Sequence, residues 1–281
     1  MKLAVIAHRA TPTNIGLAAR GWQGKPAYLL HPREALLSLG SGDVALNRLD
    51  VSEDLAGVED GNWVVNQLEA RGVRVFNRPS ALLAAHDKLI TARLLRAAGL
   101  RHPRTTRLDA SGSIGGLAYP IVAKPRYGSW GRCVDRCEDQ EALDRYIARM
   151  KHEAWWSTGG IVQELVPPYP NDLRVIVSGG EVVGAAARSP ALGEWRTNVA
   201  LGARSSSAEP PSEAGELARG AARALGIDFG GVDLLPDRDS WVVLEVNGAV
   251  DIRTHYALGR EIFDAVLRSL ECEATKPLLI A

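Results

Sequence analysis

The first residues of the chain constrain the fold most, because they contain an uninterrupted apolar run. Residues 3–7 read LAVIA, and residues 8–14 read HRATPTN, a polar stretch with a proline. A strand without polar positions is typical of a parallel sheet buried on both faces. The loop that follows such a strand commonly faces a ligand. We therefore expect the chain to begin as an α/β structure.

The next segments continue this alternation of strand and helix. Apolar runs predict strands, and apolar residues at helical spacing predict helices. The expected strands are 27–30, 43–49 and 73–77, and the expected helices are 15–20 and 61–70. Residues 1 to about 80 therefore form a small α/β lobe. Arg9, Asn14 and Arg48 lie in its loops as candidates for a substrate site, although plain surface polarity explains them nearly as well.

After Pro79 the sequence pattern changes, and it predicts longer helices and hairpins. Residues 80–100 predict one long helix, capped by Ser80 and ended near Gly99. Two glycines at 179–180 predict the turn of a hairpin over 172–188. The other expected elements are strands at 119–125 and 160–165, a hairpin at 230–247, and helices at 138–150, 212–226 and 261–272.

Two lysines are candidates for holding phosphates. Lys88 lies near the start of a predicted helix, where the helix dipole does not favour a cation. Lys124 ends the apolar strand IVAKP, where burying an unpaired ammonium group is costly. A solvated Lys88, and a Lys124 that reaches water from the strand end, remain as the alternatives.

A glycine-bearing loop follows Lys124. Residues 126–132 read RYGSWGR, in which Gly128 and Gly131 flank Ser129 and Trp130. Glycines let backbone amides approach phosphates closely, so this segment, here called the glycine loop, suits a lid over a γ-phosphate. An ordinary hairpin turn is the alternative. Residues 162–166, VQELV, offer a strand end that borders an adenine ring, or an edge strand with a solvent-facing Glu164.

The strongest single signal is a set of acidic and amide side chains near the C-terminal end. Asp233 lies in GGVDLL, and Glu245 and Asn247 lie in VLEVN. If the two segments pair as a hairpin, Asp233 faces Glu245, and Asn247 lies on the same face as Glu245. Two carboxylates and an amide oxygen are the hard ligands that Mg²⁺ prefers. We weigh this magnesium site above a salt-bridge network.

Composition excludes several other classes of protein. Lys and Arg together number 33, as do Asp and Glu, so no net charge draws the chain to nucleic acid or to a membrane surface. The three cysteines lack the spacing of a zinc knuckle or a disulfide framework. A short N-terminal apolar run and the absence of any longer one predict a cytoplasmic protein.

Taken in order, these motifs resemble the ATP-grasp superfamily, and within it the RimK/LysX group of carboxylate–amine ligases. The likeness covers roughly residues 40–250 and is most specific in GSWGR and in the RTN of EWRTNVALGA. The resemblance implies an α/β fold of three lobes, with ATP between the central and C-terminal ones. It divides the chain into an N-terminal α/β domain (1–82), a central lobe with the glycine loop (83–158) and a C-terminal lobe with the metal site (159–281).

The resemblance also assigns roles by position. Arg174, Arg196 and Asn198 would act on the acyl-phosphate and the substrate carboxylate, and Asp233, Glu245 and Asn247 would carry two Mg²⁺ or Mn²⁺ ions. Glu164 and Val166 would border the adenine, and Asp172 would contact the ribose. The complete set expected to bind ATP is Lys88, Lys124, Gly128, Ser129, Trp130, Gly131, Arg132, Gln163, Glu164, Leu165, Val166 and Asp172.

The expected reaction joins an acid to an amine through an acyl-phosphate, with a glutamate- or lysine-like amino acid as substrate. LysX-like ligation to a glutamate of a carrier protein and an ATP-grasp kinase remain as alternatives, and the oligomeric state stays open. One departure concerns the metal asparagine. Many relatives follow it with a small-Ser-Pro-Gly turn, whereas this chain reads NGAVDIR. The resemblance therefore does not assign the residues of the acceptor pocket beside this asparagine, and Asp251 and Arg253 are candidates for it.

Overall fold

The apolar N-terminal run forms an inner strand of a parallel sheet, as predicted. In the computed structural model, which describes residues 1–167, 171–238 and 240–275, β1 (Leu3–Ile6) lies between β2 (Ala27–Leu30) and β3 (Val44–Asn47). β4 (Arg74–Phe76) completes the order β2-β1-β3-β4, and all pairs are parallel.

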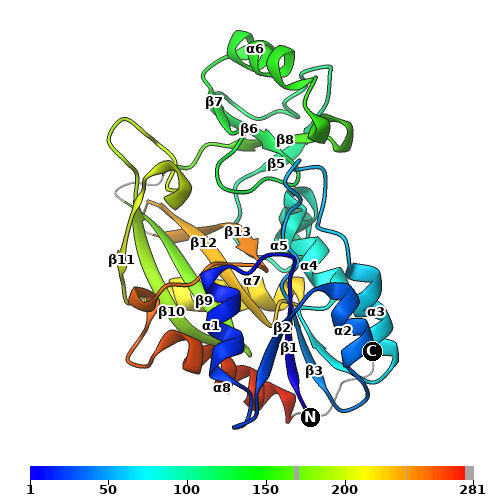
Figure 1. Cartoon of the computed structure of the whole chain (residues 1–281). Coiled ribbons are helices and arrows are strands. Elements are labelled where there is room, and N and C mark those ends of the chain that lie inside the picture. The colour runs from blue at the N-terminus through cyan, green and yellow to red at the C-terminus, as the bar shows by residue number, and fades with distance from the viewer. Residues whose placement is uncertain (168–170, 239, 276–281) are drawn as a thin grey trace.

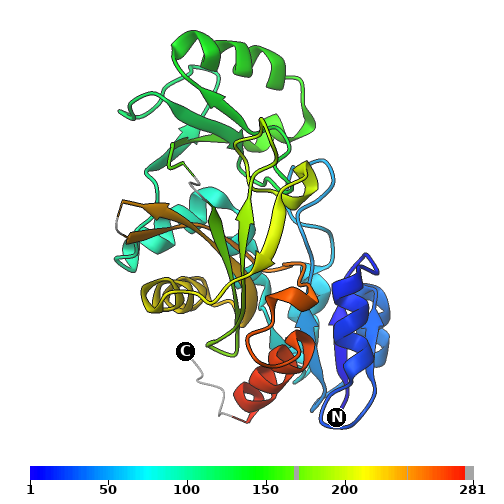
Figure 2. The same ribbon diagram turned by 90° about the vertical axis from the view of Figure 1, so that its left-hand side faces the viewer.

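Both faces of this sheet are buried, which explains why β1 lacks polar positions. Ala4 and Ile6 pack with α2 (Pro32–Ser38) and α3 (Asn62–Ala70). Leu3 and Val5 point the other way, into a core shared with α1 (Pro12–Arg20) and α8 (Ile262–Ala274). Figure 2 shows the last helix lying beside the first lobe.

A larger antiparallel sheet follows from the two predicted hairpins. Its order is β11 (Arg204–Ser207), β10 (Glu181–Ser189), β9 (Asp172–Ser178), β12 (Phe229–Asp237) and β13 (Ser240–Asn247). α7 (Ser212–Leu225) packs on one face and α8 on the other. Residue 239, in the predicted turn of the second hairpin, lies outside the described residues.

A third sheet forms the lobe at the top of Figure 1. Its antiparallel order is β5 (Thr105–Leu108), β8 (Gly160–Glu164), β6 (Ile121–Pro125) and β7 (Asp135–Cys137), and α6 (Gln140–Met150) packs on it. β8 pairs with β5 and β6, although it lies beyond residue 158, where the predicted central lobe ends. We propose that the boundary between the central lobe and the C-terminal lobe follows Glu164. Three short 3-10 turns lie at Ala154–Thr158, Val199–Leu201 and Thr254–Tyr256.

The prediction of one helix over 80–100 is wrong, because the chain breaks at Asp87. α4 (Pro79–His86) and α5 (Lys88–Ala97) replace it, and Ser80 lies inside α4 rather than capping it. The Asp87 carboxylate accepts from the amides of Leu89 and Ile90, so it starts a new helix instead of continuing the old one. Across the described residues, no helix has the length and apolarity to cross a bilayer.

Asn77 fastens the first sheet to the largest one. Its side-chain amide donates to the carbonyls of Phe229 at 2.7 Å and Gly248 at 3.1 Å, and its oxygen accepts from the amides of Asp228 and Phe229. The residue is fully buried and has φ of 56°, a left-handed conformation that asparagine tolerates better than alanine.

Replacing Asn77 by alanine should therefore lower the free energy of unfolding by about 3 kcal/mol, because buried partners lose their hydrogen bonds and alanine strains the backbone. Urea unfolding measures this loss. The matched control is Asn66→Ala on the exposed face of α3, which should change stability by less than about 0.5 kcal/mol. Equal stability of the two variants would contradict the role given to Asn77.

Candidate active site

Two adjoining cavities lie beside the glycine loop and the largest sheet, and one of them is also lined by the third sheet. Both are bordered by Ser129, Trp130, Arg188, Asn198 and Glu245. The first, here called the lysine cavity, is further lined by Lys88, Val122, Lys124, Gly128, Gly131, Val134, Gln163, Val166, Asp172, Trp195, Arg196, Thr197, Asp233, Leu235 and Leu244. The second, here called the carboxylate cavity, adds Asp50, His86, Arg174, Val199, Ala200, Asn247, Ala249, Val250, Asp251, Arg253 and Tyr256.

Lys88 connects helix α5, the glycine loop and the strand that carries Glu245. It is the first residue of α5, and its Nζ donates to the carbonyl of Gly128 at 2.6 Å. The same ammonium group lies 3.4 Å from a carboxylate oxygen of Glu245. The lysine therefore holds the glycine loop next to the acidic strand, and its ammonium group borders the lysine cavity, where it could contact a bound anion.

Lys124 is buried, with 6% of its surface exposed, as its apolar neighbours predicted. Its Nζ donates to Oε1 of Gln163 at 2.8 Å, and Gln163 in turn donates to the hydroxyl of Thr105. Burial lowers the pKa of Lys124 to about 8, although the charge of Glu245 opposes this shift. Lys124 is thus a costly buried cation that lines the lysine cavity, and no carboxylate among the described residues pairs with it directly.

The glycine loop is fastened at both ends. At its start, Arg126 makes charged hydrogen bonds to Asp87 at 2.8 Å, and the Tyr127 hydroxyl donates to the same carboxylate. At its end, Arg196 donates to the carbonyls of Gly131 and Val134. A Cβ added at Gly131 would lie 2.8 Å from Oδ1 of Asn198, so this position needs glycine.

The predicted pairing of the acidic strands is confirmed. Asp233 on β12 is the register partner of Glu245 on β13, and Nδ2 of Asn247 lies 3.5 Å from an oxygen of Asp233. Asp233 is also held by two arginines. Arg174 contacts both of its oxygens at 2.7 Å, and Arg188 lies at 3.0 Å.

These arginines set the charge state of Asp233. Burial alone would raise the pKa of its carboxyl, but Arg174 and Arg188 outweigh burial and hold that pKa well below its usual range. Asp233 is therefore an anion at neutral pH.

Several predicted residues have protein partners in place of a ligand. Asp172 is buried, accepts from Arg188 at 2.8 Å and from the hydroxyl of Thr197, and so presents little free oxygen. Arg196 is paired with Glu194 at 2.7 Å, which lowers the pKa of that carboxyl to about 2. Arg174 and Arg196 are thus already paired with carboxylates.

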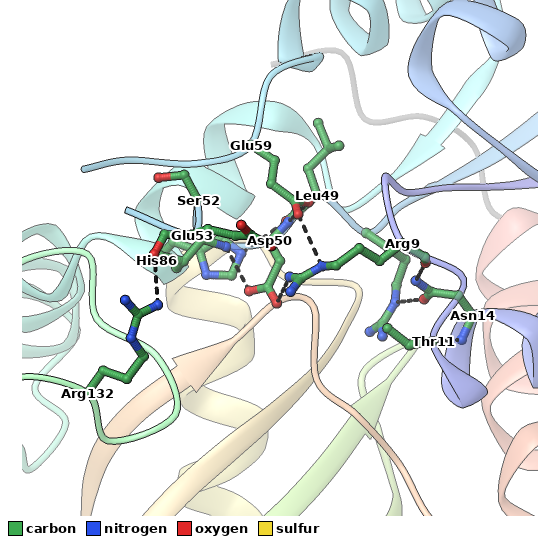
Figure 3. A network of polar contacts seen from close by, with 12 residues as sticks. Arg9, Thr11, Asn14, Leu49, Asp50, Ser52, Glu53, Glu59, His86 and Arg132 are labelled. Atoms are coloured by element: carbon green, nitrogen blue, oxygen red, sulfur yellow. Dashed lines mark hydrogen bonds and ion pairs between the residues drawn. The ribbon is translucent and has the colours of Figure 1, made fainter. Parts of the chain in front are cut away.

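Three residues of the predicted ATP-binding set do not line the lysine cavity. Arg132 turns away and donates to the carbonyl of Glu53 at 2.8 Å (Figure 3). Glu164 is exposed and lies 3.8 Å from Arg104, because Gln163 takes the inward position on the alternating strand. Leu165 borders a separate hollow with Glu164, whereas Val166 borders both.

Sequence reasoning missed Arg188, which touches both Asp172 and Asp233. The signal was present, since an arginine ends the apolar strand GAAAR, and it is the register partner of Asp172. The apolar residues Trp195, Leu235 and Leu244 were also missed, and they give the lysine cavity walls against which a flat ring can pack.

The comparisons with known proteins agree with this arrangement. A profile of the RimK-like ATP-grasp domain matches residues 85–270. The chain belongs to the RimK-like ATP-grasp family. The predicted ATP-grasp fold is confirmed, and so is the kinship with the RimK/LysX group of ATP-dependent ligases.

Named relatives of this RimK-like chain include two groups of ligases. A protein of Parasynechococcus marenigrum named "Probable alpha-L-glutamate ligase" is 31% identical over 220 residues, 75% of this chain and 46% of that protein. "Alpha-aminoadipate--LysW ligase LysX" of Sulfurisphaera tokodaii is 26% identical over 254 residues, 88% of this chain and 87% of its own. The chain thus spans about half the length of the first relative.

Solved structures share the fold over nearly the whole chain. A RimK domain protein of Sphaerobacter thermophilus has a TM-score of 0.67 at 23% identity and covers 96% of this chain and 99% of its own. D-alanine–D-alanine ligase of Bacillus anthracis, complexed with ATP, has a TM-score of 0.69 at 16% identity, with 98% of each chain covered. The ligase PsnB, complexed with a minimal precursor, Mg and ADP, has a TM-score of 0.67 at 20% identity, again with 98% of each chain covered.

The RimK-like site offers ligands that suit magnesium. Glu245 and Asn247 both border the carboxylate cavity with hard oxygen atoms. Both oxygens of Asp233 are instead bound by Arg174, and one also by Arg188, so this residue stands in the salt-bridge network that was weighed as the alternative. The ammonium group of Lys88 lies against Glu245, so a cation already fits at this carboxylate. Among the described residues no cluster of three or more His, Cys, Asp or Glu side chains could hold a metal, so the amide oxygen of Asn247 is needed to complete the set.

Proposed function

We propose that this RimK-like chain is a carboxylate–amine ligase that activates an acid with ATP and joins it to the amine of an amino acid. The single observation that supports the proposal is the position of the Glu245 carboxylate between the two cavities. Glu245 borders both cavities, pairs in register with Asp233, and lies 3.4 Å from the ammonium group of Lys88. A carboxylate in this position links a phosphate-binding cavity to a second cavity open to substrates.

The lysine cavity would hold the nucleotide. Lys88 and Lys124 would contact the phosphates, the glycine loop would cover them, and Leu235, Leu244 and Val166 would pack on the base. Asp233, Glu245 and Asn247 would hold two Mg²⁺ ions, which neutralise charge on the transferring phosphoryl group. Arg174, paired to Asp233, would turn its remaining donors towards the substrate in the carboxylate cavity.

The reaction then proceeds in two balanced steps. A substrate carboxylate oxygen attacks the γ-phosphorus, the bond to the β-phosphate oxygen breaks, and ADP leaves. The amine attacks the acyl carbon, the bond to phosphate breaks, and the amine proton passes to phosphate or water. Arg174 and Asn198 line the carboxylate cavity and could stabilise the oxyanion that forms after the amine attacks and before phosphate leaves.

The glycine loop would exclude water from the acyl-phosphate. It is fastened to Asp87 at one end and to Arg196 at the other, and Trp130 borders both cavities. Closing this loop keeps a labile intermediate from hydrolysis. We place the reaction in the cytoplasm, where the three free cysteines stay reduced.

A carrier protein as the acceptor is the second candidate, as in the LysX alternative. A hollow beside α5 and β5 is lined by Arg93, Arg96, Arg104 and Arg107, which suits an acidic protein segment. A glutamate- or lysine-like amino acid offered free in solution would not need this surface.

Product analysis tests the function. The protein is incubated with ATP, Mg²⁺, a panel of amino acids and cell extract, and ADP release and mass changes are recorded. We expect ADP release that depends on an amine, an amide product, and a hydroxamate when hydroxylamine replaces the amine. A mass gain on a protein rather than on a small molecule would identify a carrier. A stable phosphorylated product formed without amine would instead identify a kinase and overturn the ligase assignment.

A further inference from the structure

A third cavity, here called the N-terminal cavity, lies where β1 and β3 end. Its lining residues are Ala7, Arg9, Thr11, Asn14, Arg48, Asp50, Glu59, Trp130, Ala249 and Asp251. In the order β2-β1-β3-β4, the chain leaves β1 towards one side and β3 towards the other. Open parallel sheets bind ligands in the crevice at such a point.

Arg48 is buried beside this cavity, and within the described part of the chain no carboxylate is paired with it. It is 3% exposed, its Nε donates to Oδ1 of Asn14 at 3.0 Å, and its guanidinium lies 5.3 Å from the ring centre of Phe229. Its Nη1 is buried and has no hydrogen-bond partner, and no carboxylate in the described ranges forms an ion pair with it. A buried guanidinium left in this condition is costly unless an anion joins it.

The other charges around the cavity are distributed unevenly. Arg9 neutralises Asp50 at 3.0 Å and Glu59 at 3.4 Å, and Figure 3 shows it reaching between them. Asp251 is exposed, makes no ion pair in the described part of the chain, and lies near enough to act on the charge of Arg48. The N-terminal end of α1, at Thr11, adds a positive potential.

We propose that the N-terminal cavity binds a free α-amino acid, with its carboxylate on Arg48 and its ammonium group towards Asp251. This inference rests on the proposed ligase function only in treating that amino acid as a substrate. A buried cation and an unpaired anion on one cavity match the two charges of the amino acid. Arg48 rather than Arg9 is then the anchor, because the donors of Arg9 already face Asp50 and Glu59.

The location of the cavity connects this amino acid to the reaction centre. The N-terminal cavity shares Asp50, Trp130, Ala249 and Asp251 with the carboxylate cavity that contains Glu245. Trp130 of the glycine loop also lies 5.2 Å from the guanidinium of Arg9. The loop that covers the nucleotide therefore covers the amino acid as well.

Direct binding measurements test the proposal without turnover. Isothermal titration with the standard amino acids, in the presence of AMPPNP and Mg²⁺, compares the wild type with Arg48→Met. We expect the dissociation constant of the amino acid that binds to rise about 100-fold, since a buried charged pair is lost. The α-carboxamide of this amino acid should bind the wild type about 100-fold more weakly than the amino acid does. Its affinity for Arg48→Met should be little lower than for the wild type, because the carboxamide cannot form the ion pair with Arg48 that the variant removes. Asp251→Asn should weaken binding by about 10-fold or less, since this group is exposed.

Two controls and the contrary outcomes complete the experiment. Arg33→Met replaces an exposed arginine on α2 and should leave binding unchanged. Unchanged amino-acid affinity in Arg48→Met would overturn the proposal. So would a lower melting temperature with loss of AMPPNP binding, which would give Arg48 a structural role. Failure of every amino acid to bind the wild type at about 10 mM, above the usual range of KM, would overturn it too.

The outcomes also separate this inference from the ligase assignment. Amide formation by Arg48→Met with wild-type KM would overturn the amino-acid site and leave the ligase intact. Amino-acid binding that depends on Arg48, without any ADP release, would support the site and overturn the ligase. The amino acid that binds is then offered to the enzyme once as the amine substrate and once as the acid substrate. The product that forms shows which of the two substrates occupies the N-terminal cavity.

Discussion

Replacing Glu245 by alanine should reduce amine-dependent ADP release by about 1,000-fold or more, because the proposed reaction uses this carboxylate to hold Mg²⁺ and to position Lys88. Glu245 faces Asp233 across the hairpin, contacts Lys88 and borders both cavities. Removing it takes away the carboxylate beside the ammonium group of Lys88 and one of the three proposed Mg²⁺ ligands. Initial rates of ADP release, with and without amine, measure the effect.

The Glu245 experiment needs two companions. Glu245→Gln keeps the shape and removes the charge, and it should lose nearly as much activity if charge is the cause. Glu181→Ala, at the exposed start of β10, is the matched control and should retain full activity. Circular dichroism and thermal melts should show a folded protein in all three. Full turnover by folded Glu245→Ala would remove the basis of the proposed function.

Replacing Lys124 by methionine should have opposite effects on activity and stability. Turnover should fall by about 1,000-fold or more, because the phosphate contact proposed for Lys124 would be lost. Stability at neutral pH should rise, because methionine has about the same length and removes a buried charge. The burial that lowers the pKa of Lys124 from 10.5 to about 8 corresponds to a gain of up to about 3 kcal/mol.

The sign of the pH dependence follows from that pKa. The folded pKa lies below the ordinary one, so ionised Lys124 costs stability at every pH below about 8. Between about 8 and 10.5 the folded lysine is neutral while the unfolded one still binds a proton, so the cost disappears as pH rises. Urea unfolding should therefore show the largest advantage of Lys124→Met below pH 8 and little advantage near pH 10.5. Lys151→Met, an exposed substitution, is the control, and a destabilised Lys124→Met would contradict the assignment.

The sequence predicted the elements with strong local signals. LAVI had no polar position, so a buried parallel strand was the only good reading, and the pair of glycines at 179–180 marked a hairpin that the structure has. The facing of Asp233 and Glu245 was predictable because side chains alternate along a strand. Elements without a pattern were missed, including the polar strands β5 and β11, the short strand β7, and α2, whose cap is His31.

Partners that meet through tertiary packing could not be predicted. Arg174 and Asp233 lie 59 residues apart, and Lys88 and Gly128 lie 40 apart, so no local spacing signals their contact. The break at Asp87 was hidden for the same reason. Its carboxylate serves Arg126 as well as the helix, and that second partner is on another element. The direction of Arg132 and Glu164 likewise depends on neighbours that only the fold supplies.

The core shared by β1 and α8 has a consequence for synthesis on the ribosome. Leu3 and Val5 are made well before Ile262, Val266 and Leu270, with which they pack. One face of β1 then stays uncovered, with its apolar side chains exposed to the solvent or to a chaperone, until α8 emerges. The nascent chain should be most prone to aggregation during that interval, even though the finished protein hides the surface completely.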